Sequence, residues 1–339
     1  MIATFVYLGS SLPNYVLANM TQFKSRFPDS PLVFIGDSQK VCDKVELCGF
    51  NIWKVRDPED SWGINRNSMS HDPVFRNGFW FKTLARFFAL HEYLINFPTE
   101  SVLLIESDVW ISPQFPLEIF QEFAHPIAFP LATSEQGVAS TFFAKDSDCL
   151  KHFLNFAERR VLAKPDSTDV TILAEYRSNY PENTYILPSG PIELSGYNPG
   201  YTKVESEMLS DQKYFPNQIF DASTWGQFIT GEDPRNSWGF RYLYRRQISH
   251  AVNPLAFDLS MKRDAITATI NGVDYQINTL HIHSKDLLVF TESSRVISRV
   301  HGYHGTEKKE IIWRFFLRFL PSRFKHILRK QLISFRRLK

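Results

Sequence analysis

The stretch Ser101-Val-Leu-Leu-Ile-Glu106-Ser-Asp108-Val-Trp110 is an apolar run that ends in two carboxylates spaced two residues apart. The apolar part predicts a buried central strand over residues 101–105. If the backbone stays extended beyond it, Glu106 and Asp108 project to the same side. Ligands of open α/β sheets bind outside the carboxyl ends of the strands, and paired carboxylates suit Mg²⁺ or Mn²⁺ together with substrate phosphates. The pair is therefore a candidate metal site, although solvated strand ends also favour carboxylates.

Short strands and helices alternate around this stretch, as a parallel sheet requires. Strands are predicted at residues 3–8, 31–35, 51–54, 125–131, 141–144, 252–256, 266–270, 275–278 and 280–283. Helices are predicted at residues 12–27, 41–48, 79–96, 147–162 and 167–176. Asn271-Gly272 predicts a tight hairpin turn. The fold class is α/β, with a Rossmann-like, mixed and mostly parallel sheet flanked by helices.

The composition excludes a collagen-like or low-complexity chain. A chain of 339 residues with 43% hydrophobic residues is long enough to bury a large core, and it contains no repeat or Pro/Gly/Ser-rich linker. Cys42, Cys48 and Cys149 form no metal-binding or disulfide pattern, which favours a reducing compartment. The N-terminal apolar run lacks a basic region and reads as a strand rather than a signal peptide, and no apolar run is long enough to span a membrane. We expect one main domain.

Basic side chains precede and follow the acidic pair along the chain. Lys82 and Arg86 are spaced i and i+4 on the predicted helix 79–96 and therefore share one face. Near a bound metal, such cations would stabilise a departing diphosphate; a solvated basic face, or a salt bridge to Glu92, is the alternative. Late in the chain, the sequence Thr279-Leu-His-Ile-His-Ser-Lys places two histidines and a lysine on one face of a strand. Three such groups on one face are hard to explain by core packing.

An apolar strand that closes in Asp-x-Asp is the signature of the GT-A glycosyltransferases, and residues 101–108 resemble it. The sequence departs from the usual form at Glu106, so the resemblance places metal contact mainly on Asp108 and leaves the role of Glu106 open. A basic helix ahead of the acidic triplet fits the same resemblance, which favours Arg86 as a diphosphate contact. The resemblance implies Mn²⁺ or Mg²⁺ as cofactor and a nucleotide-diphosphate sugar as donor.

The cluster of histidines and lysine resembles the retaining GT-A enzymes of the glycogenin type. That resemblance implies His283 as a metal ligand, with His281 as second choice, and Lys285 as a phosphate contact. An inverting enzyme would need a carboxylate base for the acceptor hydroxyl, whereas a retaining one needs only a group near the opposite face of the sugar. The cluster favours the retaining mechanism.

The resemblance also implies contacts to the rest of the donor. The predicted contacts to the nucleotide are Tyr7, Gly9, Ser10 and Asp37. A half-buried strand aromatic and a turn-forming aspartate are equally good interpretations of Tyr7 and Asp37. The predicted contacts to the transferred sugar are Asp169, Asp221 and Gln227, the last two within residues 220–236, which resemble a motif of bacterial surface-polysaccharide transferases.

Residues 301–339 form a basic tail. They hold eleven of the 38 Lys and Arg residues, and only Glu307 and Glu310 are acidic. Arg314 and Arg318 lie i and i+4, away from rows of apolar residues, which is typical of a basic amphipathic helix pair in a membrane interface. A helix packed on the body is the alternative. The remainder of the chain is mildly acidic, and we expect no nucleic-acid partner.

Together these patterns predict a GT-A domain over residues 1–300, with a donor half at 1–115 and an acceptor half at 116–300, followed by the membrane-associating tail. The expected activity is metal-dependent transfer of a sugar to a glycan or lipid-linked acceptor in bacterial lipopolysaccharide or capsule synthesis. The expected location is cytoplasmic and peripheral, at the inner face of the membrane. A nucleotidyltransferase should show a glycine-rich phosphate loop, which Gly9-Ser-Ser-Leu matches poorly. A non-catalytic glycan-binding or scaffold protein on the same fold is the alternative.

Overall fold

A computed structural model describes residues 1–56, 62–71, 75, 78–98, 100–190, 212–226, 258–262 and 265–282. The predicted strand at 252–256 and the tail at 301–339 lie outside these ranges. The predicted site residues Gln227, His283 and Lys285 also lie outside them.

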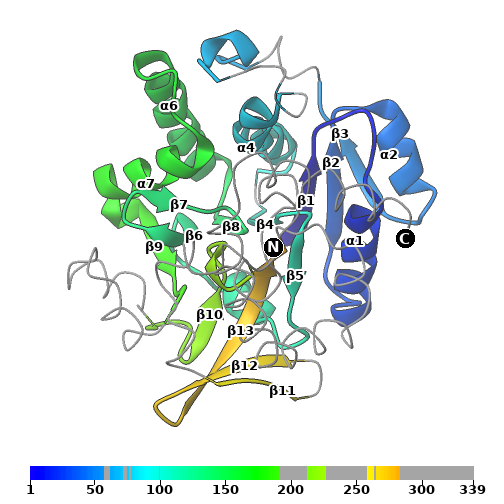
Figure 1. The fold of residues 1–339 in the computed structure, drawn as a ribbon. Coiled ribbons are helices and arrows are strands. Elements are labelled where there is room, and N and C mark those ends of the chain that lie inside the picture. Colours follow the sequence, from blue (N-terminus) through cyan, green and yellow to red (C-terminus); the bar gives the residue numbers. More distant parts are fainter. Residues whose placement is uncertain are drawn as a thin grey trace, which may run out of the picture.

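An eight-stranded sheet forms the centre of the described structure (Figure 1). Its strand order is β3-β2-β1-β4-β8-β6-β7, and β9 pairs with β6. The strands are β1 (Ile2–Tyr7), β2 (Leu32–Gly36), β3 (Asn51–Lys54), β4 (Val102–Ile105), β6 (Ile127–Thr133), β7 (Gln136–Gly137), β8 (Thr141–Ala144) and β9 (Thr184–Leu187). Neighbours among β1 to β4 are parallel, as are β6 and β9, whereas β8 runs antiparallel to β4 and β6. This mixed, mostly parallel sheet confirms the predicted fold class.

Helices cover both faces of the large sheet. The helices are α1 (Asn14–Arg26), α2 (Gln39–Glu46), α4 (Phe79–Asn96), α5 (Leu117–Gln121), α6 (Ser147–Ala163) and α7 (Asp169–Asn179). Along β4, Val102 and Leu104 pack into the core beneath α4, α6 and α7, whereas Leu103 and Ile105 pack with α1 and α2. The five predicted helices are confirmed. None of the helices in the described ranges has the length and apolar character required to cross a bilayer.

A second, five-stranded sheet lies beside the first. It has the order β10-β13-β12-β11, and β5 also pairs with β13. Its strands are β5 (Val109–Ile111), β10 (Gln218–Phe220), β11 (Asp258–Lys262), β12 (Ala265–Ile270) and β13 (Val273–His281). The prediction of two separate strands at 275–278 and 280–283 is wrong about the break between them, because 275–281 form one continuous strand. Thr279 does not interrupt it, since this residue pairs with Ile111 on one side and Phe220 on the other.

The predicted hairpin between β12 and β13 is confirmed. Asn271 and Gly272 both adopt positive φ, at 50° and 79°. Two consecutive left-handed residues give the tight turn whose twist matches that of the flanking strands. The hairpin holds β13 in register, and β13 ends at His281.

We expect a large difference between two leucine truncations that remove the same atoms. Leu104 is 1% exposed and Leu47 is 89% exposed. Leu104→Ala should therefore lower the free energy of unfolding by about 2–5 kcal/mol, through lost burial and a cavity. Leu47→Ala should change it by less than about 0.5 kcal/mol. Urea unfolding followed by circular dichroism measures both, and equal effects would contradict the assigned core.

Candidate functional site

Glu106 and Asp108 lie in a turn that connects the two sheets. The backbone N–H of Val109 donates a hydrogen bond to the carbonyl of Glu106 at 3.0 Å, as in a β-turn. The backbone is therefore not extended beyond β4, and the condition under which strand alternation would place both carboxylates on one side is not met, because β5 leaves the large sheet to pair with β13. Residues 106–109 are called the acidic turn below. Its geometry, rather than strand alternation, sets where the two carboxylates lie.

Four hydrogen bonds hold the acidic turn in place. The side-chain amide of Asn19, on α1, is fully buried and donates to the carbonyls of Ser107 at 3.2 Å and Val109 at 2.8 Å. The N–H of Glu106 donates to the carbonyl of Ser140 at 3.1 Å, and the N–H of Ile282 donates to the carbonyl of Asp108 at 2.8 Å. The turn is thus fixed to a helix and to both sheets.

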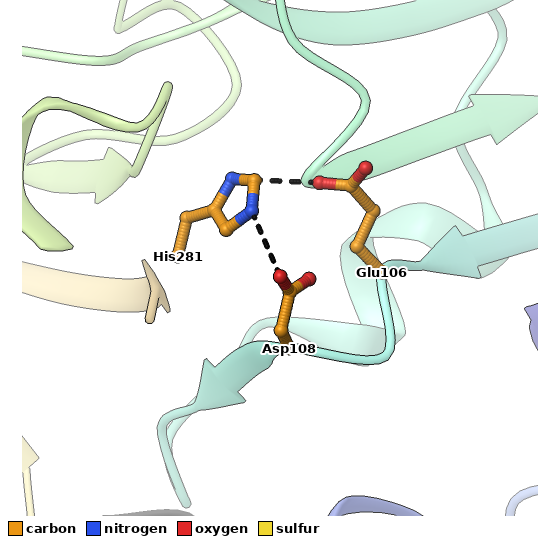
Figure 2. Close-up of side chains that lie close together, drawn as sticks. All are labelled: Glu106, Asp108 and His281. Atoms are coloured by element: carbon orange, nitrogen blue, oxygen red, sulfur yellow. Dashed lines mark ion pairs between the residues drawn. The ribbon is translucent and has the colours of Figure 1, made fainter. Parts of the chain in front are cut away.

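His281 completes a cluster with the two carboxylates (Figure 2). Nδ1 lies 3.4 Å from Oε2 of Glu106, and Nε2 lies 3.4 Å from Oδ2 of Asp108. One ligand atom from each of the three residues lies within 4.8 Å of the other two. Carboxylate oxygens and an imidazole nitrogen are suitable donors for a divalent cation such as Mn²⁺. The donor set therefore fits the metal expected from the sequence, with His281 in the position for which His283 was the first choice.

Arg86 lies behind this cluster. Its guanidinium is buried and forms ion pairs with Oε1 of Glu106 and, at 2.8 Å, with Oδ2 of Asp169. Burial by itself would lower the pKa of Arg86, but the charges and hydrogen bonds of the two carboxylates outweigh it and raise the pKa. The predicted diphosphate contact is thus replaced by a structural role, because the guanidinium is already shared between two carboxylates.

Asp169 also has a different position from the one expected. It is 4% exposed and accepts hydrogen bonds from Arg86 and, at 3.0 Å, from the hydroxyl of Thr83. Burial raises its pKa, Arg86 acts in the opposite direction, and the charge of Glu106 raises it further. Asp169 starts α7 and joins it to α4, so the carboxylate that was predicted to contact the sugar supports Arg86.

Asp221 is fully buried, and its carboxylate binds the protein backbone. Oδ1 accepts the N–H of Trp225 at 2.9 Å, and Oδ2 accepts the N–H of Gly226 at 2.7 Å and that of His281 at 2.8 Å. Burial raises the pKa of Asp221, and these hydrogen bonds act against that rise. Both oxygens are therefore used to join residues 224–226 to the end of β13, and the predicted contact to the sugar is replaced by a structural role.

The predicted nucleotide contacts gather at the ends of β1 and β2. The N–H of Gly9 donates to Oδ1 of Asp37 at 2.8 Å, and the hydroxyl of Tyr7 donates to the carbonyl of Ser11 at 2.8 Å. A Cβ added at Gly9 would lie 3.7 Å from Nζ of Lys82 and 3.3 Å from the ring of Tyr7. Burial and then the charge of Asp37 raise the pKa of Tyr7.

Lys82 brings a positive charge to this group. Burial lowers its pKa, Asp37 acts in the opposite direction, and Arg66 lowers it further. Ser10, the remaining predicted contact, is exposed beside Gly9.

Two residues of the site were not predicted from the sequence. Asn19 holds the acidic turn, and the hydroxyl of Ser223 lies 3.0 Å from Nδ1 of His281. The sequence pattern could have identified Asn19, because this polar residue interrupts the apolar side of its helix, which is formed by Val16, Met20 and Phe23. A buried amide on such a face needs hydrogen-bond partners. Ser223 gave no such signal, since its contact depends on a strand almost sixty residues later.

No protein-family model and no curated protein matches the chain. Among solved structures, the chain is similar to the galactosyltransferase LgtC in complex with donor and acceptor sugar analogs, at 11% identity and a TM-score of 0.43, over 89% of this chain and 96% of that one. It is also similar to the PaToxG glycosyltransferase, at 13% identity and a TM-score of 0.32, over 52% of this chain and 68% of that one. A third similar structure is CMP:2-keto-3-deoxy-manno-octonic acid synthetase complexed with CTP, at 11% identity and a TM-score of 0.31. The match covers 55% of this chain and 89% of that one. Sequence identities and TM-scores this low do not identify the function of this chain.

Removing the charge of Arg86 should destabilise the protein in a pH-dependent way. Arg86→Met leaves Glu106 and Asp169 buried without their cation, which should cost about 3–5 kcal/mol near neutral pH. A carboxyl whose pKa is higher in the folded than in the unfolded state gains stability as the pH falls, so protonation of Asp169 should reduce this loss in acid. Urea unfolding of variant and wild type at several pH values measures the difference. The exposed Arg159→Met is the control, and a loss that grows toward acid would contradict the assignment.

Removing the amide of Asn19 should weaken the acidic turn. Asn19→Ala leaves the carbonyls of Ser107 and Val109 without this donor, which should cost about 1–3 kcal/mol. Asn14→Ala, on the same helix but exposed, should be close to neutral. Thermal unfolding and Mn²⁺ titration compare the two variants, and Asn19→Ala should also bind Mn²⁺ more weakly. Equal behaviour of the two would show that the turn does not depend on α1.

Proposed function

We propose that this chain is a metal-dependent glycosyltransferase that moves a sugar from a nucleotide-diphosphate donor to a hydroxyl of a glycan or lipid-linked acceptor. The observation that carries the proposal is the convergence of Glu106, Asp108 and His281 in one cluster. This cluster lies next to the carboxyl end of β4, where ligands of open α/β sheets bind.

The helix α4 supports the proposal by linking the cluster to the predicted nucleotide contacts. Lys82 lies beside Gly9, and Arg86, one turn further along the same face, is paired with Glu106. One helical turn advances by about 5.4 Å. A diphosphate that extends from the ends of β1 and β2 toward the acidic turn would therefore pass close to α4. A cation at Lys82 and a metal at the acidic turn are the charges that such a group requires.

Each residue of the site has a distinct task in this proposal. Asp108 and His281, with Glu106 beside them, would hold the metal, which supplies charge stabilisation for the departing nucleotide diphosphate. Lys82 would bind phosphate oxygens, and Tyr7 and Asp37 would orient the nucleotide. Arg86 keeps the side chain of Glu106 in place and compensates its charge where water is excluded.

A retaining outcome is favoured over an inverting one. An inverting enzyme needs a carboxylate that can accept the proton of the acceptor hydroxyl. Within the described ranges, Glu106 is paired with Arg86, Asp169 lies behind Arg86, and Asp221 binds backbone N–H groups. These three carboxylates are therefore poor candidates for that base.

The acceptor and the location are inferred from the tail. We place the chain at the cytoplasmic face of a bacterial membrane, in the synthesis of lipopolysaccharide or capsule, because the basic amphipathic pattern of residues 301–339 suits an anionic lipid surface. A lipid-linked acceptor would be presented at that surface.

The decisive experiment measures donor binding and donor hydrolysis across UDP-, GDP- and CMP-sugars, with Mn²⁺ and with EDTA. We expect metal-dependent release of one nucleotide. Asp108→Asn should reduce it by about 100-fold or more, since it weakens the site for the metal that would stabilise the negative charge of the departing diphosphate. The exposed Asp29→Asn is the matched control and should retain full activity. If no donor binds under either condition, the non-catalytic glycan-binding alternative replaces this proposal.

A further inference from the structure

Ser223 adopts a backbone conformation that is unusual for its residue type. Its φ is 71°, in the left-handed region. The other described residues with positive φ are glycines and the asparagines Asn217 and Asn271, which tolerate this region. A strained residue of another type persists only when its surroundings hold it in place, and such residues cluster at functional sites.

Asp221 provides the surroundings that hold Ser223. Its carboxylate accepts the N–H groups of Trp225, Gly226 and His281, and its own carbonyl accepts the hydroxyl of Ser140 at 2.5 Å. These bonds fix the backbone on both sides of Ser223 and join it to the last residue of β13. Gly226 tightens the arrangement, because a Cβ at that position would collide with the carbonyl of His281.

The result is a contact between Ser223 and the ring of His281. The hydroxyl oxygen lies 3.0 Å from Nδ1, whereas Nε2 lies on the side of Asp108, 3.4 Å from Oδ2. Oε2 of Glu106 also faces Nδ1, at 3.4 Å. A histidine that binds a metal uses one nitrogen for the metal and donates a hydrogen bond from the other, which fixes the tautomer and the ring orientation.

We propose that Ser223 is a positioning residue that accepts the Nδ1–H of His281 and so presents the Nε2 lone pair toward Asp108. This inference rests on the proposed function in one respect, because the proposed function identifies the group that Nε2 binds as a divalent metal. Asp108 and Nε2 of His281 then form the inner metal-binding pair. Glu106, which is paired with Arg86, faces Nδ1 of the same ring.

The first test measures the tautomer of His281 in the metal-free protein. Nitrogen NMR of the full chain labelled with ¹⁵N-histidine distinguishes Nδ1–H from Nε2–H, and His281→Gln identifies the signal. We expect Nδ1–H in wild type and a shift toward the mixed, mainly Nε2–H population of a free imidazole in Ser223→Gly. The same tautomer in both proteins, or Nε2–H in wild type, would overturn the proposal.

The second test measures Mn²⁺ affinity by electron paramagnetic resonance titration. Ser223→Gly should bind Mn²⁺ about 10- to 100-fold more weakly, as expected when a partner that orients a metal ligand is lost. Its melting temperature should be unchanged or higher, because glycine adopts positive φ without strain. Asn271→Gly, at the other end of β13 and also at positive φ, is the matched control and should leave Mn²⁺ binding unchanged.

Wild-type affinity in Ser223→Gly would reject the positioning role. The two tests also separate this inference from the proposed function. If wild type binds neither Mn²⁺ nor any nucleotide sugar, the proposed function fails, and the tautomer still decides whether Ser223 orients His281.

Discussion

The pairing of β5 with β13 is the interaction on which the candidate site depends. In its register, His281 lies opposite Val109, the residue that follows Asp108 in the chain. The acidic turn and the histidine meet only because this pairing holds, although they are more than 170 residues apart in sequence. A slip of one residue would move every side chain of β13 to the other face of the sheet and take His281 away from the carboxylates.

The same pairing creates an electrostatic problem, because it brings carboxylates together where water is scarce. Glu106, Asp108 and Asp169 are all largely buried, and like charges at short range disfavour one another. Arg86 offsets part of this repulsion from behind, by pairing with Glu106 and Asp169. Asp108 lies beside Nε2 of His281, where a divalent cation would supply further positive charge. Because Arg86 pairs with Glu106 and Asp169, Lys82 is the basic residue of the two on α4 that lies beside the nucleotide contacts.

Most elements of the large sheet were predicted from the sequence, because local periodicity records which residues face its core, but the short strands β7 and β9 were not predicted. The helix at Phe79–Asn96 and the strand β4 are examples in which pattern and structure agree closely. The strand β5 was missed because its three residues follow the acidic pair without a turn signal, and its partner is set by a distant segment. Without β5, the backbone at Glu106 looked extended. The candidate metal ligands Glu106, Asp108 and His281 were thus named from residue type, while the turn that brings the two carboxylates to the histidine was not predicted.

The roles of Asp169 and Asp221 show why candidate site residues are harder to assign than elements. Both are acidic residues in polar stretches, and the sequence does not reveal whether such a carboxylate faces a substrate or a neighbouring backbone. Burial decides the question, because a carboxylate that gives up water must receive hydrogen bonds in exchange. Asp221 receives them from three N–H groups, one of them on His281. A carboxylate so saturated has little capacity left for a sugar hydroxyl, but it fixes the backbone of the histidine that the site requires. Residues 221–226, the described part of this polar segment, therefore contribute to the site by fixing the position of His281.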